Sequence, residues 1–265
     1  RMRLLSRLSI ATALLLVTAW LVALTGPANL RVANAQDKPI PTTSPDTPIS
    51  TNIPPMGLKQ AADEPIYTIP PIEREVVSVI REIKAKGEIS WNNSLLNVPE
   101  AWKKTKGNGV AVAVLDTGID SNHPDLKTRV KKEKNFTSSS TPVDKQGHGT
   151  HCGGIIAASG DLTGVAPEAI LYAGKVLDDG GSGGVVGIAK GIDWATAEGA
   201  DVISMSLGGS GADSYMPPAI KRAVDAGVIV IAAAGNEGPG ANTDGYPARY
   251  EGVISVAACD KNRAI

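Results

Sequence analysis

The chain has 265 residues, and its 26 Lys+Arg nearly balance its 27 Asp+Glu, which leaves a formal net charge of -1. A chain with this balance lacks the basic face or tail that binds nucleic acid, so no nucleic-acid partner is expected. Hydrophobic residues make up 42% of the chain and aromatic residues only 4%. We therefore expect a folded core built on Ala, Val, Ile and Leu, and not a disordered protein.

Residues 1–35 have the pattern of an export signal peptide. Basic residues precede an uncharged apolar run over 10–24, and Ala33-Asn34-Ala35 matches the small-x-small pattern that signal peptidase cleaves. The alternative is an uncleaved membrane anchor, because no charge occurs between Arg7 and Arg31. Gly26-Pro27 interrupts the run ahead of the cleavage pattern, so we favour a cleaved signal and a secreted protein. Membrane contact is expected only if the signal stays uncleaved.

Two further segments precede the globular part. Residues 36–71 hold half of the chain's 18 prolines and have no apolar periodicity, which indicates a Pro-rich linker or pro-segment. Over 72–88, Val76, Val77, Ile80 and Ile83 recur at helical spacing before Gly87. This predicts an amphipathic helix that belongs either to a pro-segment or to the start of the mature protein.

Residues 89–265 alternate between strand-like and helix-like segments. The predicted strands are apolar almost throughout, which is typical of strands buried on both faces of a parallel sheet. We expect an α/β fold of three layers, with a mostly parallel sheet flanked by helices. The predicted strands are 110–115, 170–176, 202–205, 228–234 and 253–258, and the predicted helices are 149–158, 185–197 and 217–225.

Polar or glycine-rich loops follow these strands, where a parallel sheet places its site. Their motifs together resemble the successive motifs of the subtilisin-like serine proteases, in that family's order, and the resemblance covers residues 91–265. The motifs are Val112-Ala113-Val114-Leu115-Asp116-Thr117-Gly118-Ile119-Asp120, His148-Gly149-Thr150-His151, Met205-Ser206-Leu207-Gly208-Gly209 and Ala233-Ala234-Gly235-Asn236-Glu237-Gly238.

The resemblance implies a catalytic machinery for peptide hydrolysis. A serine hydroxyl needs a base, an anion that orients the base, and donors for the oxyanion. The resemblance makes His148 the base, Asp116 the orienting carboxylate and the Asn236 amide the oxyanion donor. It also implies that an extended peptide substrate binds between two backbone segments, as an added strand. The expected substrate-binding residues are Gly181, Ser182, Gly183, Ser206, Leu207, Gly208, Ala234 and Gly235.

Specificity and cofactors are less well defined. Val185 stands where many relatives carry an aromatic residue that lines a substrate subsite, so we expect this pocket to be more open here and assign no specificity. Asp125 matches a carboxylate that ligates calcium in many relatives, but the loop 159–163 is shorter here than in those relatives. We therefore assign no certain cofactor and keep calcium at Asp125 as an alternative. Cys152 and Cys259 are expected to be buried free thiols, and the sequence does not show whether they meet.

Other chemistries fit the sequence less well. His148 and His151 are three residues apart, whereas zincin helices use a spacing of four with an intervening Glu, so we reject a metal site. We expect His151 to be packed beside Asp116 and His148. Leu115-Asp116-Thr117-Gly118 resembles an aspartic protease motif, but it occurs once and in an alternating α/β context. The glycines after residue 180 miss the dinucleotide-binding fingerprint.

The nucleophile is absent from these residues. The family's serine lies in a Gly-Thr-Ser-Met-Ala type motif, which does not occur up to Ile265, and Ser255 lies inside a predicted strand. We expect the chain to be a fragment that is inactive by itself, from a secreted serine endopeptidase. The alternative is an inactive pseudoprotease that binds extended peptides without cutting them.

Overall fold

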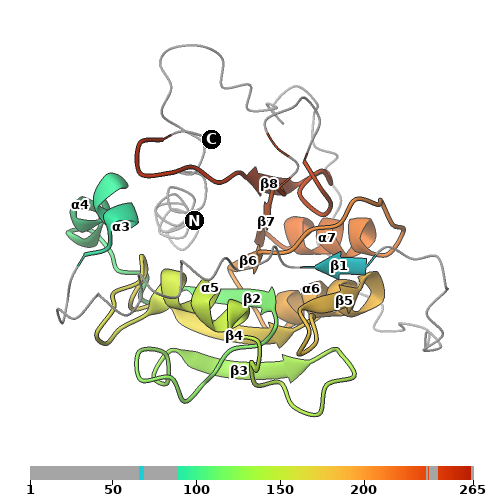
Figure 1. Cartoon of the computed structure of the whole chain (residues 1–265), viewed down its shortest axis with the longest axis horizontal. Coiled ribbons are helices and arrows are strands. Elements are labelled where there is room, and N and C mark those ends of the chain that lie inside the picture. Colours follow the sequence, from blue (N-terminus) through green and yellow to red (C-terminus); the bar gives the residue numbers. More distant parts are fainter. Residues whose placement is uncertain (1–65, 69–88, 237, 239–243, 264–265) are drawn as a thin grey trace, which may run out of the picture.

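The computed structural model describes residues 66–68, 89–236, 238 and 244–263. Its centre is a six-stranded sheet in the order β3-β4-β2-β6-β7-β8, and all five pairs in it are parallel (Figure 1). The strands are β2 (Ala111–Asp116), β3 (Val130–Asn135), β4 (Ile170–Lys175), β6 (Val202–Met205), β7 (Ile229–Ala233) and β8 (Val253–Val256). The predicted strand 202–205 coincides with β6, and the four others agree to within two residues at each end.

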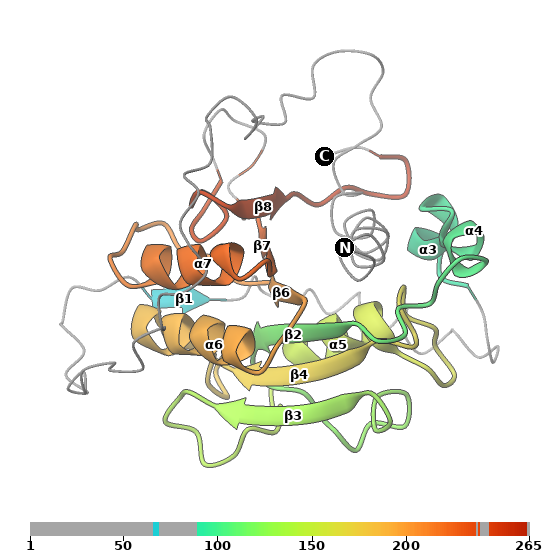
Figure 2. The same ribbon diagram turned by 180° about the vertical axis from the view of Figure 1, so that it is seen from behind.

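Helices cover both faces of this sheet. α5 (His148–Ala157) lies on one face, while α6 (Val185–Ala197) and α7 (Met216–Asp225) lie on the other (Figures 1 and 2). Side chains of a strand point alternately to opposite faces. In β2, Val112 and Val114 accordingly join the core beside α5, whereas Ala113 and Leu115 join the core beside α6 and α7. The expected three-layer α/β fold is confirmed.

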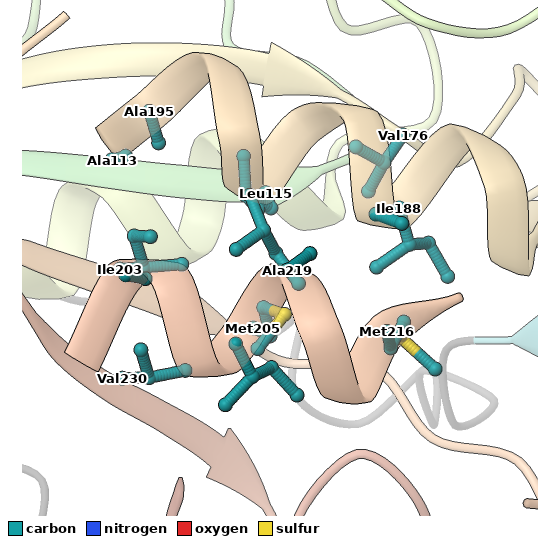
Figure 3. Close-up of a cluster of buried hydrophobic side chains, with 14 of the residues drawn as sticks. Ala113, Leu115, Val176, Ile188, Ala195, Ile203, Met205, Met216, Ala219 and Val230 are labelled. Atoms are coloured by element: carbon teal, nitrogen blue, oxygen red, sulfur yellow. The ribbon is translucent and has the colours of Figure 1, made fainter. Parts of the chain in front are cut away.

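The core beneath α6 and α7 consists mostly of aliphatic residues, together with two methionines and the aromatic residues Tyr67, Tyr172 and Trp194. Figure 3 shows Leu115 and Met205 from the sheet beside Ile188 of α6 and Ala219 of α7. Leu115, Ile188 and Ala219 are completely shielded from solvent. Full burial of a side chain as large as Leu115 or Ile188 stabilises the fold by about 1.5–3 kcal/mol. This packing holds the carboxyl ends of β2 and β6, where the site lies.

Three kinds of element were not predicted. β3 has the sequence Val-Lys-Lys-Glu-Lys-Asn, which lacks the apolar residues by which the other strands were predicted. It lies at the edge of the sheet, where charged residues are common. The short helices α3 (Trp91–Leu95) and α4 (Val98–Trp102) lack a full amphipathic period. β1 (Ile66–Thr68) and β5 (Ser182–Gly184) form a separate antiparallel pair.

The predictions for the N-terminal segments lie largely outside the described residues. The signal peptide over 1–35 and the helix over 72–88 are both outside them, and of the linker over 36–71 only β1 is described. No helix in the described part of the chain is long and apolar enough to cross a membrane.

Candidate active site

Asp116 and His148 lie in direct contact at the carboxyl edge of the sheet. Asp116 is the last residue of β2 and His148 is the first residue of α5. His148 Nδ1 is 2.8 Å from Oδ1 and 3.0 Å from Oδ2 of Asp116. Because an ionised carboxylate only accepts hydrogen bonds, Nδ1 is the donor. The neutral imidazole therefore leaves Nε2 as an acceptor for a proton.

Burial and charge act in opposite directions on His148, which is only 8% exposed. Burial lowers the pKa of this imidazole, but hydrogen bonds with Asp116 and Cys152, together with the charge of the carboxylate, outweigh burial and raise the pKa to about 10. The imidazolium is therefore the favoured form at neutral pH. General-base chemistry requires the neutral form, whose population rises as the pH rises.

Asp144, which the sequence analysis missed, connects the two sides of the site. Its Oδ1 accepts the Thr117 hydroxyl at 2.9 Å and the amide of Gly147, also at 2.9 Å. Its Oδ2 accepts both the amide and the hydroxyl of Thr150, at 2.9 Å and 2.6 Å. Asp144 therefore fixes the first turn of α5 against the end of β2. The only sequence signal for it is its place four residues before His148.

The first turn of α5 also approaches β2 too closely for a side chain at one position. A Cβ atom added to Gly149 would lie 2.0 Å from the carbonyl oxygen of Gly118 and 3.1 Å from the Cβ of Asp116. The amide of Gly149 donates to the Thr117 hydroxyl at 3.0 Å. Because Gly149 has no side chain, α5 can approach β2 closely enough for His148 to contact Asp116.

A buried lysine supports the end of β2. Lys175 is fully buried, and its Nζ donates to the carbonyl oxygen of Thr117 at 2.6 Å. Its charge is balanced by Asp179, whose Oδ1 lies 2.9 Å from Nζ. This lysine ties the residue after Asp116 to the end of β4.

The other residues of α5 near the pair differ partly from expectation. Cys152 Sγ lies 3.8 Å from His148 Nδ1, and burial raises the pKa of this thiol. Both Cys152 and Cys259 are free, but each is half-buried and not fully buried. His151 was expected to be packed, yet it is exposed, because position 151 faces away from the sheet on α5.

The polar loops predicted after the strands lie at the same edge as Asp116. Ser206, Leu207 and Gly208 directly follow β6, and Ala234, Gly235 and Asn236 directly follow β7. Asn236 is exposed, and Gly235 has a φ of 120°, a conformation that favours glycine. Ala234 and Leu207 are instead buried, so they offer backbone groups and not side-chain surface.

The chain's own β1 lies between the two segments expected to hold a substrate. β1 pairs antiparallel with β5, with Tyr67 opposite Gly183 and Thr68 opposite Ser182. On its other side, the amide of Thr68 donates to the carbonyl oxygen of Gly208 and the amide of Gly208 donates to that of Thr68, both at 3.1 Å. Residues 66–68 thus form the added middle strand.

The loop that carries Gly181 is shaped by Asp178. Its Oδ1 accepts the amides of Gly180 and Ser182 at 2.9 Å and 3.0 Å, and Gly181 has a φ of 81°. Val185, at the start of α6, is fully buried in the same apolar cluster as Tyr67. The subsite that Val185 was expected to leave open is thus part of the core that surrounds Tyr67.

Asp125 holds the short loop over 159–163 in place through backbone amides. Its Oδ1 accepts the amide of Asp161 at 2.9 Å, and its Oδ2 accepts the amide of Leu162 at 3.3 Å. The short loop is packed so tightly that a Cβ atom on Gly160 would lie 1.9 Å from Oδ1. Both carboxylate oxygens therefore accept hydrogen bonds from backbone amides of this loop, which is the role that the structure shows for Asp125.

One group of three possible metal-ligating side chains occurs among the described residues, namely Asp116, His148 and Cys152. The contact between Asp116 and His148 explains two of its members without a metal. We therefore describe the site as an acid–base pair.

Comparison with known proteins shows the family of this chain. Residues 107–265 match the model of the subtilase family. Thermitase of Thermoactinomyces vulgaris is 44% identical over 172 residues, which cover 63% of this chain and 61% of thermitase. The thermostable alkaline protease of Halalkalibacterium halodurans is 46% identical over 187 residues, which cover 68% of this chain and 50% of that protein. The intracellular serine protease of Paenibacillus polymyxa is 44% identical over 196 residues, which cover 70% of this chain and 60% of that protein.

The fold and the site thus define a member of a known class of hydrolases. The chain belongs to the subtilase family of serine proteases, as its motifs predicted. It spans about half to three fifths of the length of the curated relatives described above.

Proposed function

We propose that the protein is a secreted serine endopeptidase that cuts peptide bonds in proteins through an Asp-His-Ser triad. The observation that supports this most directly is the contact between His148 Nδ1 and the buried carboxylate of Asp116, 2.8 Å apart at the carboxyl edge of a parallel sheet. The pair has the polarity that a serine protease requires, with Nε2 left to accept a proton.

In the proposed mechanism, neutral His148 takes the proton of a serine hydroxyl as that oxygen attacks the substrate carbonyl carbon. Asp116 stabilises the imidazolium that results and keeps the ring oriented. The Asn236 amide donates to the oxyanion of the tetrahedral intermediate. His148 then gives its proton to the leaving amine, and water hydrolyses the acyl-enzyme by the same steps.

The nucleophile is a serine that these 265 residues do not supply. Ser255 lies in β8, and its hydroxyl donates to Asp244 at 3.1 Å, so it is engaged away from the pair. We infer that the triad is completed by a serine in the portion of the family domain that this chain lacks. The chain alone is then inactive.

The substrate in this proposal is a protein segment in extended conformation. β1 supports this, because its backbone forms a strand between β5 and Gly208 through hydrogen bonds that any sequence except proline can make. We infer that residues 66–68 belong to a pro-segment that occupies the substrate position until it is displaced. Secretion is supported by the signal-like pattern over 1–35, although one relative is named as an intracellular protease.

A fluorophosphonate probe on the full-length protein tests this function. One covalent adduct is expected, found by intact mass, and none is expected in the variants His148→Ala or Asp116→Asn. Asn236→Ala should keep the serine but reduce turnover by about 10²–10³-fold, the loss that removal of such a donor causes in subtilisin itself. A full-length protein that binds extended peptides but forms no adduct would instead be the peptide-binding pseudoprotease.

A further inference from the structure

Tyr67 is the most deeply buried residue of β1. Its side chain is fully shielded from solvent, whereas Ile66 beside it is 62% exposed. The ring belongs to the apolar cluster that includes Val185, Leu207 and Met216. It lies close to Gly209, where an added Cβ atom would be 3.3 Å from two ring atoms. The position that Tyr67 occupies therefore accepts a large flat ring.

This position is apolar along the ring but polar at its far end. The Tyr67 hydroxyl lies 3.1 Å from the carbonyl oxygen of Gly211 and 3.4 Å from Oδ2 of Asp213. Burial raises the pKa of Tyr67, and the neighbouring Tyr250 and Asp213 raise it further. The phenol therefore stays protonated, and these two acceptors share its single hydrogen.

The Asp213 carboxylate is held in place by its other contacts. Its Oδ1 accepts the amides of Tyr215 and Met216 at the start of α7, at 2.7 Å and 2.8 Å. The Tyr250 hydroxyl donates to Oδ2 at 2.7 Å, and the Asp213 amide donates to that same hydroxyl at 2.6 Å. Oδ2 is therefore held in place, 3.4 Å from the Tyr67 hydroxyl.

We propose that the protein selects substrates that place a tyrosine at the position of Tyr67, and that Asp213 is the specificity-determining residue that recognises the phenol hydroxyl. This inference rests on the proposed function, because it assumes that β1 occupies the place of a substrate strand. The backbone pairing of β1 is independent of side chains, so selectivity must come from the buried side chain.

Phenylalanine provides the sharpest comparison with tyrosine. It has nearly the same shape but brings no donor, so the carbonyl oxygen of Gly211 and Oδ2 of Asp213 lose the one hydroxyl hydrogen that they share. Sites built to bond a hydroxyl reject the analogue that lacks it, and a bond to a charged acceptor corresponds to about 10–100-fold in affinity. We expect a preference for tyrosine over phenylalanine of about 10-fold or more.

Cleavage of a peptide library by the full-length protein tests the selectivity. Aligned cleavage sites should show tyrosine favoured over phenylalanine at one fixed position relative to the cut bond. Asp213→Asn keeps the Oδ1 acceptor for α7 but turns Oδ2 into an amide donor, so the tyrosine-to-phenylalanine ratio should fall towards one. Because the ratio compares two substrates of the same sample, partial unfolding of a variant does not change it.

Two further variants act as controls. Tyr250→Phe removes the hydroxyl that competes for Oδ2, so the preference for tyrosine should persist. Gly209→Ala narrows the space beside the ring and should weaken both substrates while it leaves their ratio unchanged. The inference is overturned if the wild-type protein shows a tyrosine-to-phenylalanine ratio near one, or if Asp213→Asn has the same ratio as the wild-type protein.

A binding measurement separates this inference from the proposed function. A labelled peptide with the sequence of residues 64–70, and its phenylalanine counterpart, are titrated into the 265-residue chain carrying Tyr67→Ala. Tighter binding of the tyrosine peptide by about 10-fold supports the role of Asp213 even if the full-length protein cuts nothing. Equal affinities, or no binding of either peptide, reject it even if the protein is an active protease.

Discussion

The Thr117 hydroxyl donates a hydrogen bond of 2.9 Å to Oδ1 of Asp144, and this bond joins the end of β2 to the loop that begins α5. The same hydroxyl oxygen accepts the amide of Gly149, one residue after His148. Asp116 precedes Thr117 in the chain. The distance between the proposed acid and base is thus set by a short chain of buried hydrogen bonds, with Asp144 at its centre.

Asp144→Ala should destabilise the fold by about 3 kcal/mol or more, because it leaves several donors without an acceptor in a site that is largely buried. Asp144→Asn keeps one acceptor oxygen and should cost less. Denaturant unfolding measures both. Asp161→Asn, at an exposed position, is the matched control and should stay within about 0.5 kcal/mol of the unchanged chain. If Asp144→Ala matches this control, Asp144 has no positioning role.

Gly149→Ala and Gly154→Ala should have opposite effects on stability although both lie in α5. At Gly149 the new Cβ would meet the Gly118 carbonyl oxygen at 2.0 Å, so α5 must move away from Asp116. At Gly154 nothing lies within 4 Å of the new Cβ, and alanine should stabilise the helix by about 0.5–1 kcal/mol. Melting temperatures measure the difference. Equal shifts for the two variants would contradict the close approach.

Asp116→Asn should lower the pKa of His148 from about 10, because the charge that stabilises the imidazolium is lost. NMR titration of the imidazole measures this pKa directly. In the full-length protein, activity should rise with pH as His148 loses its proton, and Asp116→Asn should reduce kcat by about 10⁴-fold. An unchanged His148 pKa in the variant would show that Asp116 does not control this base.

The same pKa predicts how stability depends on pH. The folded-state pKa of His148 lies above its unfolded value of about 6.5. The stabilisation by the charged pair is therefore complete below about pH 6.5 and is lost as the pH rises through about 10. The difference in unfolding free energy between the unchanged chain and Asp116→Asn should shrink over this interval. A difference that grows with pH would refute this assignment.

Thr68→Pro should release β1 from its position. Proline lacks the amide that donates to the Gly208 carbonyl oxygen, so the backbone pairing on that side is broken. Hydrogen exchange of the Gly208 amide, which donates to Thr68, should accelerate about 10-fold or more. Ile66→Ala changes an exposed side chain of the same strand and should leave exchange unchanged. Equal protection of Gly208 in both variants would show that β1 does not cover this edge.

Local sequence patterns predicted most of the sheet because its central strands are continuous apolar segments. β2 is buried at every residue, and Asp116, its last residue, is the only charged one in it. β3 escaped prediction because an edge strand is stabilised by backbone pairing and needs few apolar side chains. Asp144 was not predicted as a site residue, because its partners are backbone amides and hydroxyl groups, which leave no recognisable pattern in the sequence around it.

The sequence by itself determined the fold class through its apolar periodicity. It determined the family, and Asp116 and His148 as candidate catalytic residues, through short motifs. Only the tertiary structure decided where Tyr67 lies and what its hydroxyl contacts. Tyr67 and Asp213 are separated by 146 positions in the chain. β1 pairs with the Ser-Gly-Gly of β5 through backbone groups alone, which every residue except proline offers. Such a contact exists only once the core beneath α6 and α7 has brought both segments together.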